Sequence, residues 1–113
     1  MSSKSSVDEL PSAAVFAALG DETRLVLVGR LSRGSRYSIA RLTEGSTLTR
    51  QAITKHLRVL ENAGIVRSVR HGRESLFEFD PRPLAEARHY LDLVSEQWDQ
   101  ALDRLKAFVE DEP

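Results

Sequence analysis

The stretch from residue 49 to residue 73 constrains the fold most, because it reads as a helix, a stop and a hairpin in succession. Apolar positions recur at intervals of three and four, which places them on one helix face. They are Ala52, Ile53, His56, Leu57 and Leu60. The hydroxyl of Thr49, or of Thr47 just before it, can cap the first free N–H groups, and Gly64 is a suitable stop. The sequence therefore predicts a helix with both ends marked, which we call the reading helix.

A β-hairpin is predicted directly after the reading helix. Strands over residues 66–70 and 75–79 flank the turn His71-Gly72-Arg73, and Phe77 and Phe79 alternate toward one face. A helix followed by a hairpin with a basic tip is the layout of a winged DNA-reading unit.

Polar side chains occupy the outward face of the reading helix and the tip of the hairpin. Their chemistry is that of groups that contact base edges and phosphates. The residues from which we expect DNA contacts are Thr49, Arg50, Gln51, Thr54, Lys55, Arg58, Arg70, His71 and Arg73. The alternative is an ordinary solvated face, and the distribution of charge decides between the two.

Charge is segregated along the chain. The formal net charge is only -1, a value that would argue against nucleic acid if it were spread evenly. Residues 24–73, however, hold eleven Lys or Arg against two Glu, a formal charge of +9, and the remainder carries −10. Such segregation predicts one basic surface on an acidic body, which is the electrostatic footprint of phosphate binding.

Two helices are predicted near the start of the chain. Residues 7–19 form a short apolar helix with Pro11 near its beginning, where a missing N–H costs little. Asp21 is placed to cap a second helix that ends before Gly34. The side chains expected on the inward stripe of this second helix are Leu25, Val28 and Leu31.

A further short helix completes a helix-turn-helix. It covers residues 38–44, with Ile39 and Leu42 as its apolar anchors, and the turn 45–47 leads from it into the reading helix. The predicted fold is mainly α with a small β-hairpin: a winged helix-turn-helix of about five helices plus a two-stranded wing.

The last third of the chain reads as one long helix after Pro81 and Pro83. Its apolar positions keep a heptad spacing throughout. They are Leu84, Ala87, Leu91, Val94, Trp98, Ala101, Leu105 and Phe108, and Tyr90, Leu102 and Val109 widen the stripe. This stripe packs either on its own domain or on a second copy of the chain.

We favour a dimer that uses the terminal helices. So small a body cannot cover so long a stripe, and duplex DNA suits a protein with two-fold symmetry. The residues that we expect at the dimer interface are Leu10, Leu84, Leu91, Val94, Trp98, Leu105 and Phe108.

Length and composition indicate one domain over residues 1–113. We expect a disordered tail at 1–6, a DNA-binding core with its wing at 7–80, and a dimerisation helix at 81–109. With no cysteine, the chain has no disulfide, thiolate metal site or cysteine nucleophile. No run approaches the roughly 18 apolar residues of a membrane span, so we expect a cytoplasmic protein. Without a phosphate-binding glycine loop or a recognisable catalytic set, no enzymatic activity and no cofactor are expected.

Two segments carry a resemblance to a known family. GDETRLVLVGRL resembles the D-x-T-R-L motif of the ArsR/SmtB family of bacterial winged-helix repressors. LTRQAITKHLRVLENAGIVRSVRHGRESLFEFD resembles the same family's L-S-Q-x-x-V-S-x-H-L-x-x-L-x-x-A-G-L-V segment and wing. The match covers roughly residues 13–80, and the remaining tail looks like the C-terminal helix of a metal-independent branch. The resemblance implies a homodimer that represses transcription from an operator until a signal intervenes.

The resemblance also assigns positions. The base-contacting positions of the family fall on Arg50, Gln51, Thr54 and Lys55. Thr49-Arg50 stands where many members have Ser-Gln, which implies a different operator, and Ser46-Thr47 stands where the family usually has Leu-Gly.

Metal sensing, which is common in this family, is not expected here. The cysteine pair of the family is absent before the reading helix. His89 and Asp92 share a helix face, with Glu96 one turn further on, and could supply part of a zinc site between protomers. His56 and His71 lie elsewhere in the chain, and the family's companion Asp-x-His is missing, so we predict no metal site.

The sequence thus favours a homodimeric repressor that binds double-stranded DNA at an inverted-repeat operator. One alternative is a metal-responsive repressor of the same fold. Another is a winged-helix module that docks a protein without touching DNA, but such a module needs exposed apolar anchors, and this chain has basic side chains there instead. The effector, either a protein or a small molecule, is not identified by the sequence.

Overall fold

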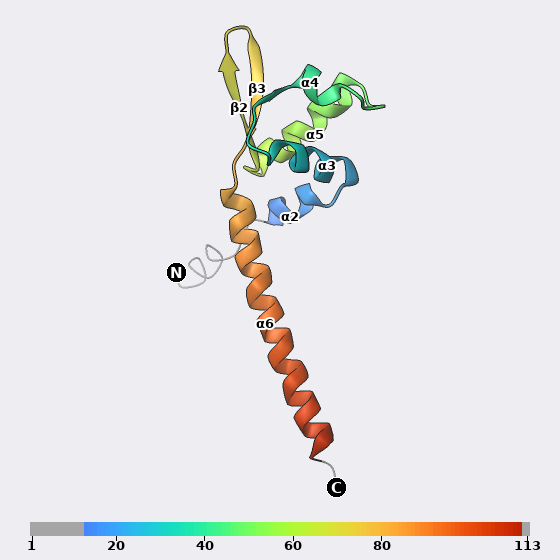
Figure 1. The fold of residues 1–113 in the computed structure, drawn as a ribbon, viewed down its shortest axis with the longest axis vertical. Helices are drawn as coiled ribbons and strands as arrows, with labels where there is room; N and C mark the ends of the chain where they lie inside the picture. Colours follow the sequence, from blue (N-terminus) through green and yellow to red (C-terminus); the bar gives the residue numbers. More distant parts are fainter. Residues whose placement is uncertain (1–12, 112–113) are drawn as a thin grey trace.

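The structure is a computed structural model that describes residues 13–111. Over this range five helices and a small sheet form a winged helix-turn-helix, as the sequence predicts (Figure 1). In chain order the elements are α2 (Ala13–Leu19), α3 (Glu22–Leu31), β1 (Tyr37–Ser38), α4 (Ile39–Thr43), α5 (Arg50–Asn62), β2 (Val66–His71), β3 (Glu74–Phe79) and α6 (Arg82–Glu110). The predicted tail at 1–6, the first part of the predicted helix at 7–12 and the interface residue Leu10 lie outside the described residues.

Helix starts follow the predicted caps. The Asp21 carboxylate accepts a hydrogen bond from the main-chain N–H of Arg24 at 3.0 Å and so caps α3. Thr49, rather than Thr47, caps the reading helix α5, since its hydroxyl accepts from the Ala52 N–H at 3.1 Å. Ser38 caps α4 in the same way and therefore precedes that helix instead of belonging to it.

The reading helix ends at Gly64, as predicted. Gly64 has a φ of +80°, a conformation that glycine adopts without strain. Its N–H donates to the Glu61 carbonyl, and the N–H of Ile65 donates to the Leu60 carbonyl. This pair of bonds is a Schellman stop, which turns the chain directly into β2.

One aliphatic core lies between α3, α4, α5 and the sheet. Its largest fully buried side chains are Leu31, Leu42, Ile53, Leu57, Leu60, Ile65 and Val66. The prediction for α3 was wrong at Leu25, which is 53% exposed, whereas Leu27 is buried beside Val28 and Leu31. Four successive apolar residues in α3 fit two neighbouring stripes equally well, so the period alone selected the wrong one.

The sheet has three strands in the order β1-β3-β2. The sequence analysis missed β1, which has only two residues and is too short to show alternation; Tyr37 pairs with Phe77 of β3. The hairpin closes between His71 and Glu74, with Gly72 at a φ of +64° in the tip. Phe77 is buried and Phe79 partly buried against the core, as the predicted alternation requires.

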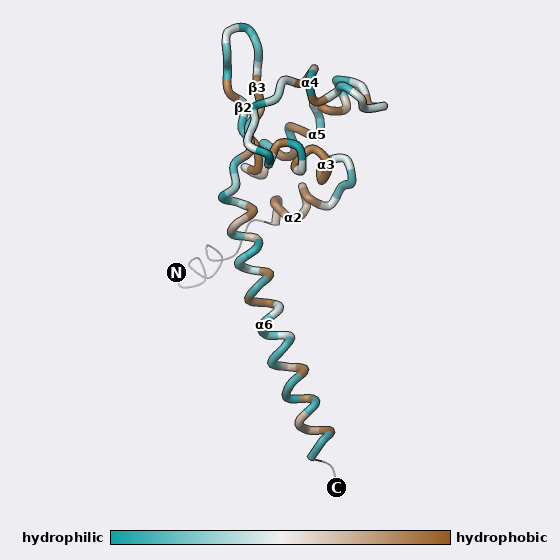
Figure 2. Tube along the Cα trace, viewed as in Figure 1, coloured by the Kyte–Doolittle hydropathy of each residue, from teal (hydrophilic) through white to brown (hydrophobic). Residues whose placement is uncertain are grey.

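The last helix, α6, leaves the body and extends far beyond it (Figure 1). It begins at Arg82, with Pro83 in its first turn, whereas a helix that follows Pro83 would begin two residues later. Leu84 and Ala87 pack against the core, and Tyr90 meets Phe16 of α2 edge to face at 6.1 Å. Apolar residues continue along the rest of the helix to its end (Figure 2).

Candidate nucleic-acid interface

The reading helix α5 separates an inner from an outer face. Ile53, Leu57 and Leu60 are buried, while Arg50, Gln51, Lys55 and Arg58 are exposed. These four exposed residues and Thr54 line one shallow hollow on the outer face. The predicted helical contacts with DNA therefore share one surface, beginning at the capping Thr49.

Thr54 is more constrained than its neighbours. Its hydroxyl donates to the Arg50 carbonyl in the preceding turn at 2.7 Å. Because the hydroxyl proton is used, Thr54 offers a base edge only an acceptor lone pair or its methyl group. The sequence did not reveal this restriction.

The wing continues the same surface. A second hollow, of about 470 Å³, lies between α5 and the sheet, and Thr54 and Arg58 line both hollows. Its other lining residues are Ile39, Glu61, Asn62, Ser68, Ser75 and Phe77. Asn62, Ser68 and Ser75 were not singled out from the sequence; Ser68 is already engaged, because its hydroxyl donates to the Glu61 carboxylate at 3.0 Å. Arg70, His71 and Arg73 are exposed at the far end of the wing.

Several basic residues between positions 24 and 73 form hydrogen bonds or ion pairs within the chain. Arg24 and Arg30 donate to main-chain carbonyls. Arg36 and Arg67 both bind the Glu78 carboxylate, at 3.0 and 2.8 Å. These two hydrogen bonds, that of Arg67 first, hold the pKa of Glu78 below its ordinary value of 4.5. The charge count from sequence overlooked this, because Glu78 lies beyond residue 73.

The basic residues on the outer face of the reading helix and at the tip of the wing have no such partners among residues 13–111. Within residues 13–111, the side chains that form no hydrogen bond or ion pair include Arg50, Lys55, Arg58, Arg70 and Arg73. Arg50 stands in the first turn of α5, where the helix dipole disfavours a cation. An uncompensated positive surface on the outer face of a capped helix and its wing is suited to a polyanion.

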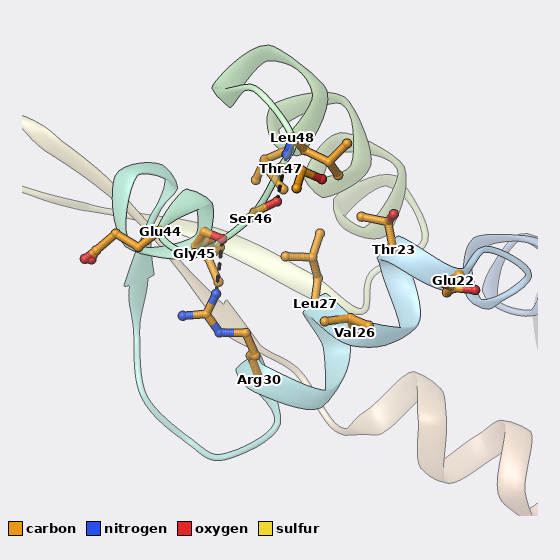
Figure 3. A pocket seen from close by; sticks show the side chains of 12 residues that line it. Glu22, Thr23, Val26, Leu27, Arg30, Glu44, Gly45, Ser46, Thr47 and Leu48 are labelled. Carbon is orange, nitrogen blue, oxygen red and sulfur yellow. Dashed lines mark hydrogen bonds between the residues drawn. The ribbon is translucent and has the colours of Figure 1, made fainter.

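A hollow of about 420 Å³ lies between α3 and the turn that precedes the reading helix (Figure 3). Leu27 and Leu48 lie on opposite sides of it. Hydrogen bonds hold the turn: the Ser46 hydroxyl accepts from the Leu48 N–H at 3.0 Å, and the Ser46 N–H donates to the Thr43 carbonyl at 3.0 Å. The turn is thus positioned by hydrogen bonds at the place where the family pattern has a leucine.

The three histidines, His56, His71 and His89, lie on different elements. Among residues 13–111, no three His, Asp, Glu or Cys side chains are arranged to hold a metal ion. His89, Asp92 and Glu96 are exposed on α6, His71 is on the wing, and His56 is partly buried on the inner side of α5. No helix within the described range is both long and apolar enough to cross a bilayer.

Comparison with known proteins found regulators of one kind. The chain is 42% identical to the uncharacterised HTH-type transcriptional regulator YuzN of Bacillus subtilis over 77 residues, 63% of this chain and 84% of that protein. It is 32% identical to the HTH-type transcriptional regulator Rv2034 of Mycobacterium tuberculosis over 97 residues, 86% of this chain and 87% of that protein.

A solved structure matches over nearly the whole chain. It is an ArsR-like transcriptional regulator from Rhodococcus sp. RHA1, with a TM-score of 0.82 and 35% identity, covering 96% of this chain and 97% of that chain. No family model matches the sequence.

Proposed function

Because this chain belongs to the ArsR family of winged helix-turn-helix transcriptional regulators, we propose that it represses transcription as a homodimer bound to an inverted-repeat operator. Its relatives are transcriptional regulators, and we propose no enzymatic activity for it. With DNA as its target, it would act in the cytoplasm.

The observation that carries this proposal is the division of basic residues between two environments. Arg36 and Arg67 are paired with Glu78 at the base of the wing, whereas the basic residues on the outer face of the reading helix and at the tip of the wing have no partner among residues 13–111. In the proposed complex the reading helix enters the major groove, and Gln51 and Lys55 contact base edges there. Arg70, His71 and Arg73 would hold phosphate or the adjacent minor groove.

Dimerisation is supported by the exposed stripe on α6. Leu91 is 52% exposed and Phe108 is 70% exposed, although both belong to the heptad stripe that is predicted to form the dimer interface, or seam. An unpartnered apolar stripe of this length indicates an interface. A dimer would also place two reading helices about 34 to 36 Å apart, on successive turns of one DNA face.

The test compares binding to the operator with binding to random DNA. The operator is first located by footprinting the region upstream of the gene. Gln51→Ala or Lys55→Ala should weaken operator binding by about 1 to 3 kcal/mol and change binding to a scrambled duplex little. If Gln51→Ala weakened binding to both duplexes equally, the reading helix would not be the element that distinguishes the operator sequence.

A further inference from the structure

The two segments that carry the family resemblance contact each other through Arg24 and His56. Neither residue is among the expected DNA contacts. Arg24, near the start of α3, has three guanidinium nitrogens on three acceptors. Nε donates to the Ala18 carbonyl at 2.6 Å and Nη2 to the Ala17 carbonyl at 3.3 Å. Nη1 lies 3.3 Å from Nδ1 of His56 on the reading helix. One side chain thus joins the end of α2, the start of α3 and the middle of α5.

This contact limits the hydrogen-bond role open to Nδ1 of His56. A guanidinium has donors and no acceptor, so Nδ1 of His56 must accept the hydrogen bond from Arg24. An imidazole that accepts this bond is neutral and carries its proton on Nε2. An imidazolium has a proton on both nitrogens, and it would set a donor and a like charge against Arg24.

The Asp21 carboxylate is a second neighbour of His56, and it can accept a hydrogen bond from a charged imidazole. Oδ2 of Asp21 lies 3.7 Å from Nδ1 of His56. The pKa of Asp21 is lowered from 3.8, first by the hydrogen bond from the Arg24 main chain, so this carboxylate is ionised wherever an imidazole titrates.

Among residues 13–111, the ionisable side chains in contact with His56 come from α3. Asp21 and Arg24 face it from α3. The described part of α2, residues 13–19, contains only alanine, valine, phenylalanine and leucine. Neutral His56 therefore pairs with Arg24, and protonated His56 pairs with Asp21.

We propose that Arg24 is a positioning residue for the reading helix, and that protonation of His56 transfers the imidazole from Arg24 to Asp21 and weakens the preference for the operator. His56 lies on the inner side of α5, so its charge changes the seating of the helix instead of touching DNA. The same Arg24 holds the end of α2, whose Phe16 contacts Tyr90 of α6. The link therefore connects the reading helix to the helix that would form the dimer.

The inference rests on the proposed function, and its test separates the two. The affinity of the full chain for its operator and for a scrambled duplex of equal length is measured from pH 5.5 to 8 at constant ionic strength. We expect the ratio of the two affinities to fall at least threefold toward pH 5.5. The same measurement on His71→Gln separates any contribution of the wing histidine from that of His56.

Three variants assign the effect to residues. His56→Asn keeps an acceptor oxygen that does not titrate, so its ratio should not change with pH. Arg24→Lys cannot reach three acceptors and should lower the ratio at pH 8 and remove its pH dependence, with an unchanged circular dichroism spectrum. His89→Gln, on the exposed face of α6, should keep the wild-type profile. A wild-type ratio that is flat with pH, or a His56→Asn profile like that of the wild type, overturns the proposal.

An NMR measurement on the free protein makes the test independent of DNA. Imidazole ¹⁵N shifts at pH 8 should show the Nε2–H tautomer of His56, and at pH 5.5 the Nδ1 proton should be in a hydrogen bond to Asp21. An Nδ1–H tautomer at pH 8 contradicts the inference. If the protein preferred no operator at any pH while these shifts were as expected, the proposed function would fail but the exchange of partners would stand.

Discussion

The winged body and the outer part of α6 differ in how far their apolar side chains are buried. In the body, Leu31, Leu57 and Leu60 are fully buried by elements of the same chain. Along α6 from Leu91 onward, large apolar side chains stay exposed at seam positions, up to 70% for Phe108. The body covers its own core, whereas the outer part of α6 leaves large apolar side chains exposed within residues 13–111.

Charged groups follow the same division. At the base of the wing, Arg36 and Arg67 share Glu78, and Arg82 binds Asp80. On the reading face, Arg50 and Lys55 have no such partner among residues 13–111. Groups that stabilise the fold are therefore paired within the chain, and groups left unpaired indicate where a second molecule is expected. The following predictions test this division from its largest consequence to its smallest.

Charge in the proposed seam should have the largest effect. Leu91→Asp would bury two carboxylates in one apolar interface, which should cost more than about 4 kcal/mol per dimer and dissociate it. Sedimentation equilibrium at micromolar concentration should show dimer for the wild type and monomer for the variant. Leu93→Asp is the matched control, because Leu93 is also exposed on α6 but lies off the heptad stripe. A wild-type monomer, or equal dissociation by both variants, would break the comparison.

The body should lose stability without losing its capacity to dimerise. Leu57→Ala removes a fully buried side chain and should lower the free energy of unfolding by about 2 to 5 kcal/mol in urea titrations. Val59→Ala, on the exposed side of the same helix, should change it by less than about 0.5 kcal/mol. The dimer dissociation constant should be the same for both variants. A weaker dimer in Leu57→Ala would mean that core and seam are coupled.

The sequence predicted the body because local signals and burial agree there. Asp21 and Thr49 cap helices as predicted, and Gly64 stops the reading helix. The apolar stripe of α5 has one clear period, and the three leucine or isoleucine positions on it are buried. Where several local rules point to the same element, tertiary structure has little to decide.

Other features depend on packing between distant segments, which one sequence does not display. Leu25 was misplaced because α3 has two possible stripes, and contact with α5 and the sheet selected the other. Strand β1 exists only because Tyr37 meets Phe77, forty residues away. In the candidate site, the sequence counted basic residues correctly but could not show that Glu78 neutralises Arg36 and Arg67.

Salt dependence should distinguish paired from unpaired arginines. Arg73→Ala removes a side chain with no partner among residues 13–111, and it should flatten the plot of log binding constant against log salt by about one per protomer on any duplex. Arg36→Ala removes the same charge from a side chain bound to Glu78 and should leave the slope within error of the wild type. Equal slopes for the two variants would show that formal charge, not pairing, controls DNA binding.

The smallest expected effect concerns the junction between the two regions, where Asp80 connects β3 to α6. Hydrogen bonds from the side chain and then the main chain of Arg82 lower the pKa of Asp80 from 3.8 to about 2. A carboxyl whose pKa is depressed by folding stabilises the fold above its unfolded pKa, and this contribution is lost as pH falls through the folded pKa. The free energy of unfolding of the wild type minus that of Asp80→Asn should therefore be constant above about pH 5 and shrink between about pH 4 and 2. Urea titrations across this range measure it, with Asp99→Asn, exposed on α6, expected to show no such step. A difference that stays constant down to pH 2 would mean that the Asp80–Arg82 pair orients α6 without stabilising the fold, and that the body and the helix meet only through their apolar contacts.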